Sequence, residues 1–247
     1  MKEIIQRPFV VFWKTWFFMS FLVSGLVLFP IFKLLFAFDK NLWALYLLKF
    51  WGVFVRYSTG LILYKKGDLQ LPKAPYIIVS NHSSYLDIVF MFALIPDYFA
   101  FLGKAELEKW PIVQMFFKSG MQIPVPRASR KGSHEAYNKS KKAIEDGTCL
   151  VIFPEATIPN YVPKMRAFKN GAFRLAIETQ VPIVPISFPN NYKRMKSGGF
   201  LKAFGSPGLA PAIFHGSIST VGMREEDIVP LRDRIFNIID KDLDHEN

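Results

Sequence analysis

The run TCLVIF at residues 148–153 is the strongest structural signal in this 247-residue chain. It is apolar without interruption, which predicts a strand with both faces buried, as in the interior of a parallel sheet. On either side of it, β-rich runs and helical patterns alternate. The strands are expected at residues 76–80, 98–102, 122–125 and 181–188, and the helices at 84–94, 105–118, 133–146, 171–179 and 225–243. This alternation predicts an α/β fold with a mostly parallel sheet flanked by helices.

End residues mark two of these helices. Ser133 is expected to cap the helix at 133–146, with Glu135 in its first turn and Gly147 closing it. Within 105–118, Pro111 is expected to begin a new helix, because proline fits the first helical turn.

The first 64 residues differ in composition from the rest of the chain. They hold four of the five tryptophans, seven of the 31 basic residues and two of the 20 acidic residues, so their net charge is +5 and that of the remainder is +6. From Thr15 to Phe32, 18 residues carry no charge, close to the ~20 apolar residues of a membrane-spanning helix. No A-x-A cleavage site follows, so a removable signal peptide is not expected. We therefore expect an N-terminal two-helix membrane-associating motif at 1–64 and an α/β domain at 65–247.

Basic residues in the N-terminal segment recur at a spacing of seven. The pairs are Arg7 with Lys14, Lys33 with Lys40, and Lys49 with Arg56. Seven residues make about two helical turns, so each pair shares a face. A basic stripe opposite Phe, Trp and Leu predicts two amphipathic helices lying in a membrane interface, with a turn at 39–41 between them. Two alternatives stay open: a transmembrane hairpin, and a helical layer packed on the globular domain.

Composition excludes several classes of protein. Hydrophobic residues make up 51% of the chain and charged residues 21%, which excludes a disordered or collagen-like chain. The single cysteine, Cys149, excludes an intrachain disulfide framework and a cysteine-based zinc cluster, and it favours a reducing compartment. The net charge of +11 fits an anionic membrane surface. Nucleic-acid binding is not expected, because the chain lacks a basic recognition helix and an aromatic-basic platform.

The chemistry begins at NHSSYLD, residues 81–87. His82 follows a predicted strand, at the edge where open α/β sheets place their ligands. Asp87 lies five residues later, so a short loop and a helix start can fold His82 back toward it. An aspartate bonded to one ring nitrogen fixes the tautomer and leaves the other nitrogen free as a base. The alternative is a helix-capping histidine beside an exposed aspartate.

Motifs that the sequence lacks narrow the reaction. There is no G-x-S-x-G elbow, Walker loop or G-x-G-x-x-G, and no histidine cluster suggests a metal. Cys149 lies in the predicted interior strand, which favours buried packing over a nucleophilic role. A His–Asp base without a protein nucleophile suits activation of a substrate hydroxyl for attack on an activated acyl group.

Three further segments accompany this motif. FPEAT at residues 153–157 follows the interior strand, the stretch from Gly120 to Arg127 ends in an arginine, and VPIVPI at 181–186 is a proline-bearing strand. With these blocks in this order, residues 76–190 resemble the glycerolipid acyltransferases, and most closely the 1-acylglycerol-3-phosphate acyltransferases. That family carries NHxSxxD-like, G…R, FPEGT-like and VPI-like blocks.

The resemblance implies a role for each matching residue. His82 would be the general base that deprotonates the acceptor hydroxyl, and Asp87 would orient it. Arg127 would bind the acceptor phosphate, a task that suits a bidentate guanidinium. Glu155 and Thr157 would help to hold the glycerol phosphate. Residues 181–186 would shape the acyl side of the cleft.

The chain departs from the family pattern in the second and third blocks. Ala156 replaces a glycine, Ile158 replaces an arginine, and two prolines interrupt the second block. Positive charge is therefore expected from elsewhere. Lys104 matches a basic position before the second block, and Arg166 or Lys169 could replace the missing arginine.

The resemblance implies a membrane-bound acyltransferase. It would acylate the 2-hydroxyl of lysophosphatidic acid with acyl coenzyme A or acyl carrier protein, a thioester co-substrate, and would need no other cofactor. Thioester donors favour the cytoplasmic face of the inner or plasma membrane. Glycerol-3-phosphate, another lysophospholipid, or a non-catalytic lipid-binding role remain alternatives. The sequence leaves the oligomeric state open.

Overall fold

A seven-stranded sheet forms the centre of the molecule in the computed structural model, which describes residues 2–109, 111–126, 128–201 and 203–243. The strands are β1 (Leu61–Gly67), β2 (Ile77–Ser80), β3 (Phe99–Lys104), β4 (Gln122–Val125), β5 (Cys149–Ile152), β6 (Ile183–Ser187) and β7 (Gly208–Phe214). Their order is β1-β7-β6-β2-β5-β3-β4. Strands β2 to β6 are parallel, whereas β7 is antiparallel to β6 and parallel to β1. The predicted mostly parallel sheet is confirmed.

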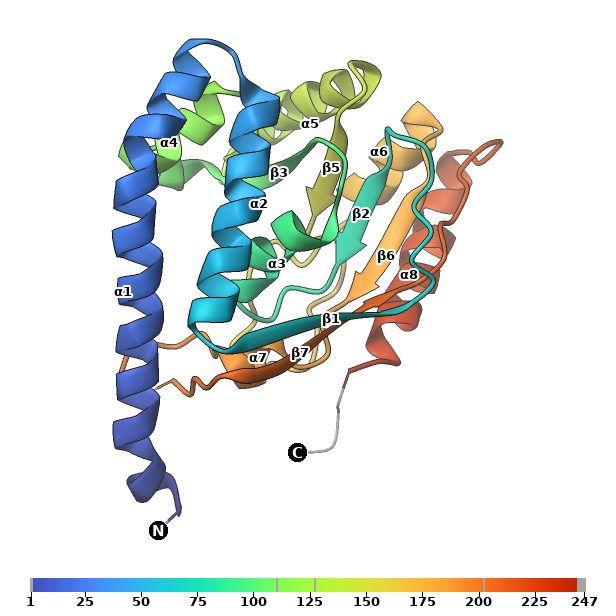
Figure 1. Cartoon of the computed structure of the whole chain (residues 1–247). Helices are drawn as coiled ribbons and strands as arrows, with labels where there is room; N and C mark the ends of the chain where they lie inside the picture. Colours follow the sequence, from blue (N-terminus) through green and yellow to red (C-terminus); the bar gives the residue numbers. More distant parts are fainter. Residues whose placement is uncertain (1, 110, 127, 202, 244–247) are drawn as a thin grey trace.

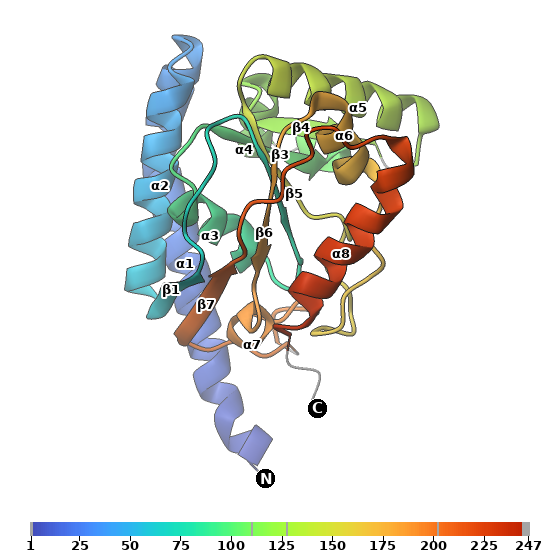
Figure 2. The same cartoon turned by 90° about the vertical axis from the view of Figure 1, so that its right-hand side faces the viewer.

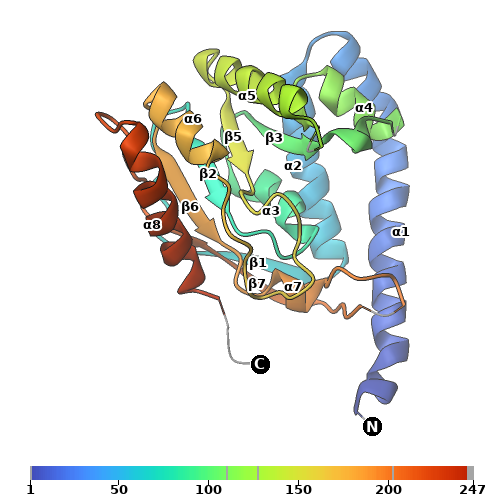
Figure 3. The same cartoon turned by 180° about the vertical axis from the view of Figure 1, so that it is seen from behind.

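Helices cover both faces of the sheet (Figures 1 and 2). On one face lie α1 (Lys2–Ala37), α2 (Asn41–Ser58), α3 (Leu86–Leu94) and α4 (Pro111–Lys118). On the other face, seen in Figure 3, lie α5 (Arg130–Glu145), α6 (Gly171–Thr179) and α8 (Ile228–Asp240). Three short elements are η1 (Ala105–Lys109), α7 (Asn191–Arg194) and η2 (Glu225–Asp227). The predicted α/β fold with flanking helices is therefore confirmed.

Each interior strand contributes side chains to two separate apolar clusters. In β2, Ile78 joins the cluster beneath α2 and α3, whereas Ile77 and Val79 join the cluster beneath α6 and α8. In β5, Val151 and Leu150 divide in the same way. Burial on both faces explains why these strands have continuous apolar sequences. Each large apolar side chain buried here contributes about 1.5–3 kcal/mol.

Two strands and several boundaries differ from the sequence-based expectations. β1 and β7 were not predicted, and β1 crosses the boundary expected between residues 64 and 65. The helix predicted at 133–146 begins at Arg130, because Ser129 rather than Ser133 caps it and accepts a 3.0 Å bond from the Gly132 amide. The helix predicted at 225–243 is divided into η2 and α8. A new helix does begin at Pro111, as predicted.

The N-terminal helices pack on the domain along one side and are exposed along the other. In α1, Trp13, Phe17 and Phe32 are buried. Trp51 of α2 donates a 2.7 Å hydrogen bond to Ser24 of α1. The helical layer that was left open as an alternative is thus present. The outward sides carry many exposed apolar residues, including Phe12, Val27, Trp43 and Phe50. By length and composition, Arg7–Ala37 could also cross a membrane.

The predicted basic stripe on these helices is wrong at three of its positions. Lys14 is 2% exposed, and its ammonium group donates to the carbonyl oxygens of Gly199 (3.1 Å), Phe200 (2.5 Å) and Ala203 (2.9 Å). The segment between α7 and β7 accordingly reaches α1 (Figure 3). Lys49 and Arg56 likewise donate to backbone carbonyls, of Pro96 and Leu63. These hydrogen bonds join the helices to the domain.

Candidate active site

The candidate site lies where β2 ends and α3 begins. His82 stands in the loop between them, at the carboxyl edge of the sheet. The neighbouring strands β5 and β6 end at the same edge, since they run parallel to β2. Ligands of open α/β sheets bind at this edge. The topology therefore brings the segments after three strands to one place.

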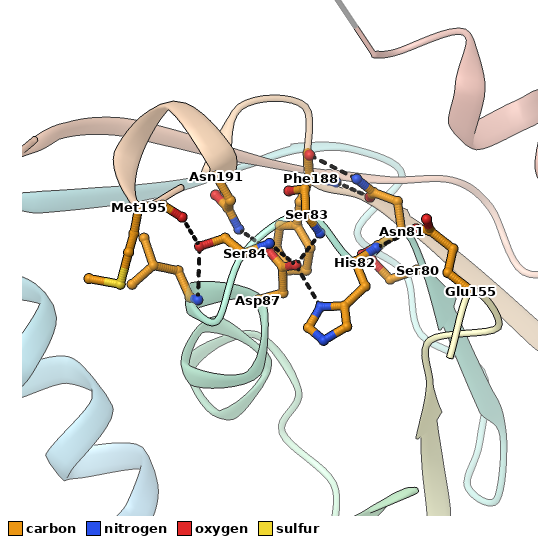
Figure 4. Close-up of polar contacts among 11 residues, drawn as sticks. Ser80, Asn81, His82, Ser83, Ser84, Asp87, Glu155, Phe188, Asn191 and Met195 are labelled. Carbon is orange, nitrogen blue, oxygen red and sulfur yellow. Dashed lines mark hydrogen bonds and ion pairs between the residues drawn. The ribbon is translucent and has the colours of Figure 1, made fainter. Parts of the chain in front are cut away.

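A short hydrogen bond joins His82 to Asp87. Nδ1 of His82 lies 2.9 Å from Oδ2 of Asp87 (Figure 4). Asp87 is fully buried in the first turn of α3. The same Oδ2 accepts the backbone N–H groups of Ser83 (2.7 Å) and Ser84 (2.9 Å). The helix N-terminus and these amides stabilise a negative charge at Asp87.

The hydrogen-bonding capacity of Asp87 fixes the tautomer of His82. An ionised carboxylate only accepts hydrogen bonds, so the proton on the ring must be on Nδ1 and Nε2 must be the basic nitrogen. Among the described residues, none hydrogen-bonds to Nε2. The ring stacks on Phe153, with centroids 4.3 Å apart, and the side chain is 13% exposed. The imidazole is therefore oriented on two sides and open at the nitrogen that can accept a proton.

Glu155 supports the His82 loop from the end of β5. Its Oε1 accepts the backbone N–H of His82 at 2.7 Å, and its Oε2 accepts the backbone N–H of Arg166 at 2.8 Å. The residue is 2% exposed, and burial raises the pKa of its carboxyl group to about 7. Both carboxylate oxygens of Glu155 therefore bind backbone N–H groups, whereas the sequence resemblance predicts that Glu155 helps to hold the glycerol phosphate.

Ala156 adopts a backbone conformation that favours glycine. Its φ is +64°, in the left-handed region, and its amide donates a 3.0 Å bond back to Phe153. A residue with a Cβ pays roughly 1–2 kcal/mol in this region. Glycine, which the resembling family has at this position, would adopt this conformation without that cost.

Three of the residues predicted to bind the acceptor phosphate lie at the surface. Lys104 is at the end of β3, about half exposed, with its ammonium group 3.9 Å from the Glu106 carboxylate. Thr157 and Arg166 are exposed. Arg127 lies outside the described residues. The structure thus brings His82, Asp87, Glu155 and the backbone of Arg166 together, and their chemical roles stay predictions.

The sequence pattern did not single out several residues of the site. Asn81 joins the ends of β2 and β6: its Oδ1 accepts the Phe188 amide at 2.7 Å, and its Nδ2 donates to the Phe188 carbonyl at 3.0 Å. Asn81 and Ser84 lie inside the motif at residues 81–87, so membership of this motif could have identified them. Asn191 donates to Asp87 from α7, and nothing in its local sequence marks it.

Cys149 is not part of the site. It is fully buried in β5, and burial raises the pKa of its thiol to about 11. The neutral thiol is a poor nucleophile. This agrees with the expectation that Cys149 packs in the interior.

Comparison with known proteins adds independent information. A family model described as Acyltransferase matches residues 63–189, which is just over half of the chain. A 1-acyl-sn-glycerol-3-phosphate acyltransferase alpha of Mus musculus is 28% identical over 196 residues, covering 73% of this chain and 63% of that protein. A 1-acyl-sn-glycerol-3-phosphate acyltransferase of Saccharomyces cerevisiae is 31% identical over 134 residues, covering 53% and 44%. The matched regions thus span about half to two thirds of these relatives.

One solved structure has the same fold. The 1-acyl-sn-glycerophosphate acyltransferase PlsC of Thermotoga maritima superimposes with a TM-score of 0.75 at 23% identity, covering 98% of this chain and 95% of that one. At this identity, the match supports the fold alone, including the N-terminal helices that the superposition covers.

Proposed function

Because this chain belongs to the acyltransferase family, we propose that it is a membrane-bound enzyme that acylates the 2-hydroxyl of lysophosphatidic acid and gives phosphatidic acid. The acyl donor is a thioester, acyl coenzyme A or acyl carrier protein, and no further cofactor is needed. The observation that carries the proposal is the 2.9 Å contact of His82 with a buried Asp87, which leaves Nε2 open to substrate. The names of the relatives support the choice of acceptor.

The proposed reaction begins with proton transfer to His82. Nε2 takes the proton of the 2-hydroxyl while its oxygen attacks the thioester carbonyl carbon. A C–O bond forms, the C–S bond breaks, and the imidazolium returns the proton to the leaving thiolate. Asp87 stabilises the imidazolium in between. The products are the new ester and a free thiol, so protons and electrons balance.

We assign the acceptor phosphate to the cationic rim of the site. Lys104 lies at the same carboxyl edge as His82, and the exposed Arg166 follows the loop that Glu155 holds. Because of the sequence resemblance, we also assign Arg127 and Thr157 to binding of the acceptor phosphate. Glu155 acts indirectly in this proposal, since its two oxygens accept the backbone N–H groups of His82 and Arg166 and hold these residues in place.

The N-terminal helices suit a substrate that resides in a bilayer. Their outward sides carry exposed Phe, Trp and Leu side chains, and each one buried in lipid contributes about 1.5–3 kcal/mol. The net charge of +11 favours anionic lipid. We place the site on the cytoplasmic face of the inner or plasma membrane, where thioester donors are found.

Replacement of His82 by alanine tests the mechanism. Transfer of a labelled acyl group to lysophosphatidic acid should fall by at least the ~10²–10⁴-fold that general-base assistance supplies, while liposome binding persists. His134→Ala is the matched control, because His134 is exposed on α5, away from Asp87. Comparable turnover in His82→Ala would refute the mechanism.

The same assay separates the alternatives. A panel of glycerol-3-phosphate and other lysophospholipids, each offered with both thioesters, identifies the acceptor and the donor. Binding to anionic liposomes without product from any acceptor would support the non-catalytic lipid-binding role. Salt-sensitive binding to DNA would contradict the assignment of the positive charge to lipid.

A further inference from the structure

The segment at residues 188–195, which follows β6, is fastened to the loop that carries the site (Figure 4). Ser84 Oγ donates to the carbonyl oxygen of Met195 at 2.7 Å. Asn191 Nδ2 donates to Oδ1 of Asp87, also at 2.7 Å. The second bond differs from the first, because it ends on a carboxylate that itself contacts the proposed base.

The two oxygens of Asp87 have different surroundings. Oδ2 receives three donors, namely Nδ1 of His82 and the backbone amides of Ser83 and Ser84. Oδ1 receives one hydrogen bond from the described residues, donated by Asn191. A buried oxygen that loses its hydrogen-bond donor is destabilised. The side of Asp87 that faces away from His82 therefore depends on one amide.

Among the described residues, the side chain of Asn191 makes this one hydrogen bond. Asn191 is fully buried, and its own Oδ1 has no hydrogen-bond partner among the described residues. If the amide were reversed, its oxygen would face the Asp87 carboxylate, and two acceptors would repel each other. An amide that leaves one end unpaired in the interior is costly. The interaction with Asp87 is what offsets that cost.

We infer that Asn191 is a positioning residue for the proposed acyl transfer: by holding Oδ1 of Asp87, it keeps Oδ2 directed at His82. This inference rests on the proposed function. Without the amide, Oδ1 is left buried without the donor that the structure shows, so the carboxylate rotates toward other donors. The contact of Oδ2 with His82 then weakens, although no group that touches substrate has changed.

Two substitutions test this role by kinetics between pH 6 and pH 9. Asn191→Leu has nearly the same shape and donates nothing, so kcat should fall about tenfold at every pH with KM unchanged. Asn191→Asp places a second carboxyl group beside Asp87, and the two share one proton because neighbouring like charges resist full ionisation. At low pH, the shared proton forms the hydrogen bond to Oδ1 of Asp87 that the Asn191 amide N–H forms in the wild type. At high pH this proton is lost, and the hydrogen bond is lost with it. The activity of this variant relative to wild type should therefore fall at least tenfold as the pH rises.

A matched control and a second measurement keep the test decisive. Asn237→Asp makes the same change at an exposed position of α8 and should keep the wild-type pH profile. Because Asn191→Asp is compared with itself at two pH values, a loss of stability alone does not produce the predicted slope. A ratio to wild type that is constant with pH would overturn the inference, as would a wild-type kcat in Asn191→Leu.

Nitrogen NMR of the histidine side chains gives a readout independent of turnover. In the wild type, the proton of neutral His82 should reside on Nδ1, and in Asn191→Leu the tautomer protonated on Nε2 should become populated. The His82 signals are assigned from their loss in His82→Ala. A wild-type protein that transfers no acyl group would refute the proposed function, and an unchanged tautomer in Asn191→Leu would refute the role of Asn191.

Discussion

Replacement of Glu155 by glutamine should make the protein more stable at alkaline pH and less active. The ionised carboxylate accepts two backbone N–H groups, from His82 and Arg166. Glutamine offers one oxygen and one amino group, so one of these buried N–H groups loses its acceptor. Such a loss costs about 1–3 kcal/mol, which corresponds to about 5- to 150-fold in rate when it disturbs the base.

The effect on stability follows from the titration of Glu155. Burial raises the pKa of this carboxyl from its ordinary value of 4.5 to about 7 in the folded protein. Between these values the unfolded chain has lost the proton and the folded protein still holds it, so stability falls as pH rises through this window. A difference of roughly 2.5 pH units at 1.36 kcal/mol per unit gives about 3 kcal/mol. Glutamine does not titrate and avoids this loss.

Urea unfolding in detergent, followed by tryptophan fluorescence, measures the difference. At pH 4.5 the variant and the wild type should have similar stability, because protonated glutamic acid resembles glutamine. At pH 8 the variant should be more stable by about 3 kcal/mol. Glu178→Gln is the control, since Glu178 is exposed beside Lys141; its effect should stay within about 0.5 kcal/mol at both pH values. An effect of Glu155→Gln that is the same at both pH values would refute the reasoning.

Three further changes have defined outcomes. Ala156→Gly should raise the free energy of unfolding by about 1 kcal/mol, because glycine tolerates the positive φ; a lower denaturation midpoint would contradict this. Lys14→Met should cost at least about 2 kcal/mol by removing the side-chain donor of the Phe200 and Ala203 carbonyl oxygens, and chymotrypsin should then cleave after Phe200 faster than in the wild type. Arg166→Ala keeps the backbone bond to Glu155 and should raise KM for the acceptor about tenfold with kcat unchanged; an unchanged KM would remove Arg166 from the phosphate site.

The interior of the sheet was predictable because its strands are buried on both faces. The runs predicted at residues 76–80 and 148–153 have apolar centres, at 77–79 and 149–152, which lie in β2 and β5. The two missed strands have weaker patterns. β1 continues the apolar run of the preceding helix, and β7 contains Pro211, which argues against a strand. Their pairing with each other stabilises both, and that contact joins residues far apart in the chain.

The site was predictable to the extent that it is local. Asp87 lies five residues from His82, and Glu155 follows a neighbouring strand at the same edge. Asn191 is 104 residues from Asp87, and in sequence this asparagine at the start of a short polar segment resembles many surface asparagines. Lys14 shows the same limit, because its spacing from Arg7 suggests a shared exposed face. Its three acceptors lie about 185 residues further along.

The contacts of Asn191 and Met195 with the loop at residues 82–87 can form only late in the synthesis of the chain. The loop that carries the base leaves the ribosome long before its last supports, since Asn191 and Met195 follow their partners by 104 and 111 residues. At about 5–20 residues per second, roughly 5–20 seconds pass in which His82 and Asp87 have been synthesised and Asn191 and Met195 have not. A nascent chain released before Met195 should therefore have no competent base, however complete its motif.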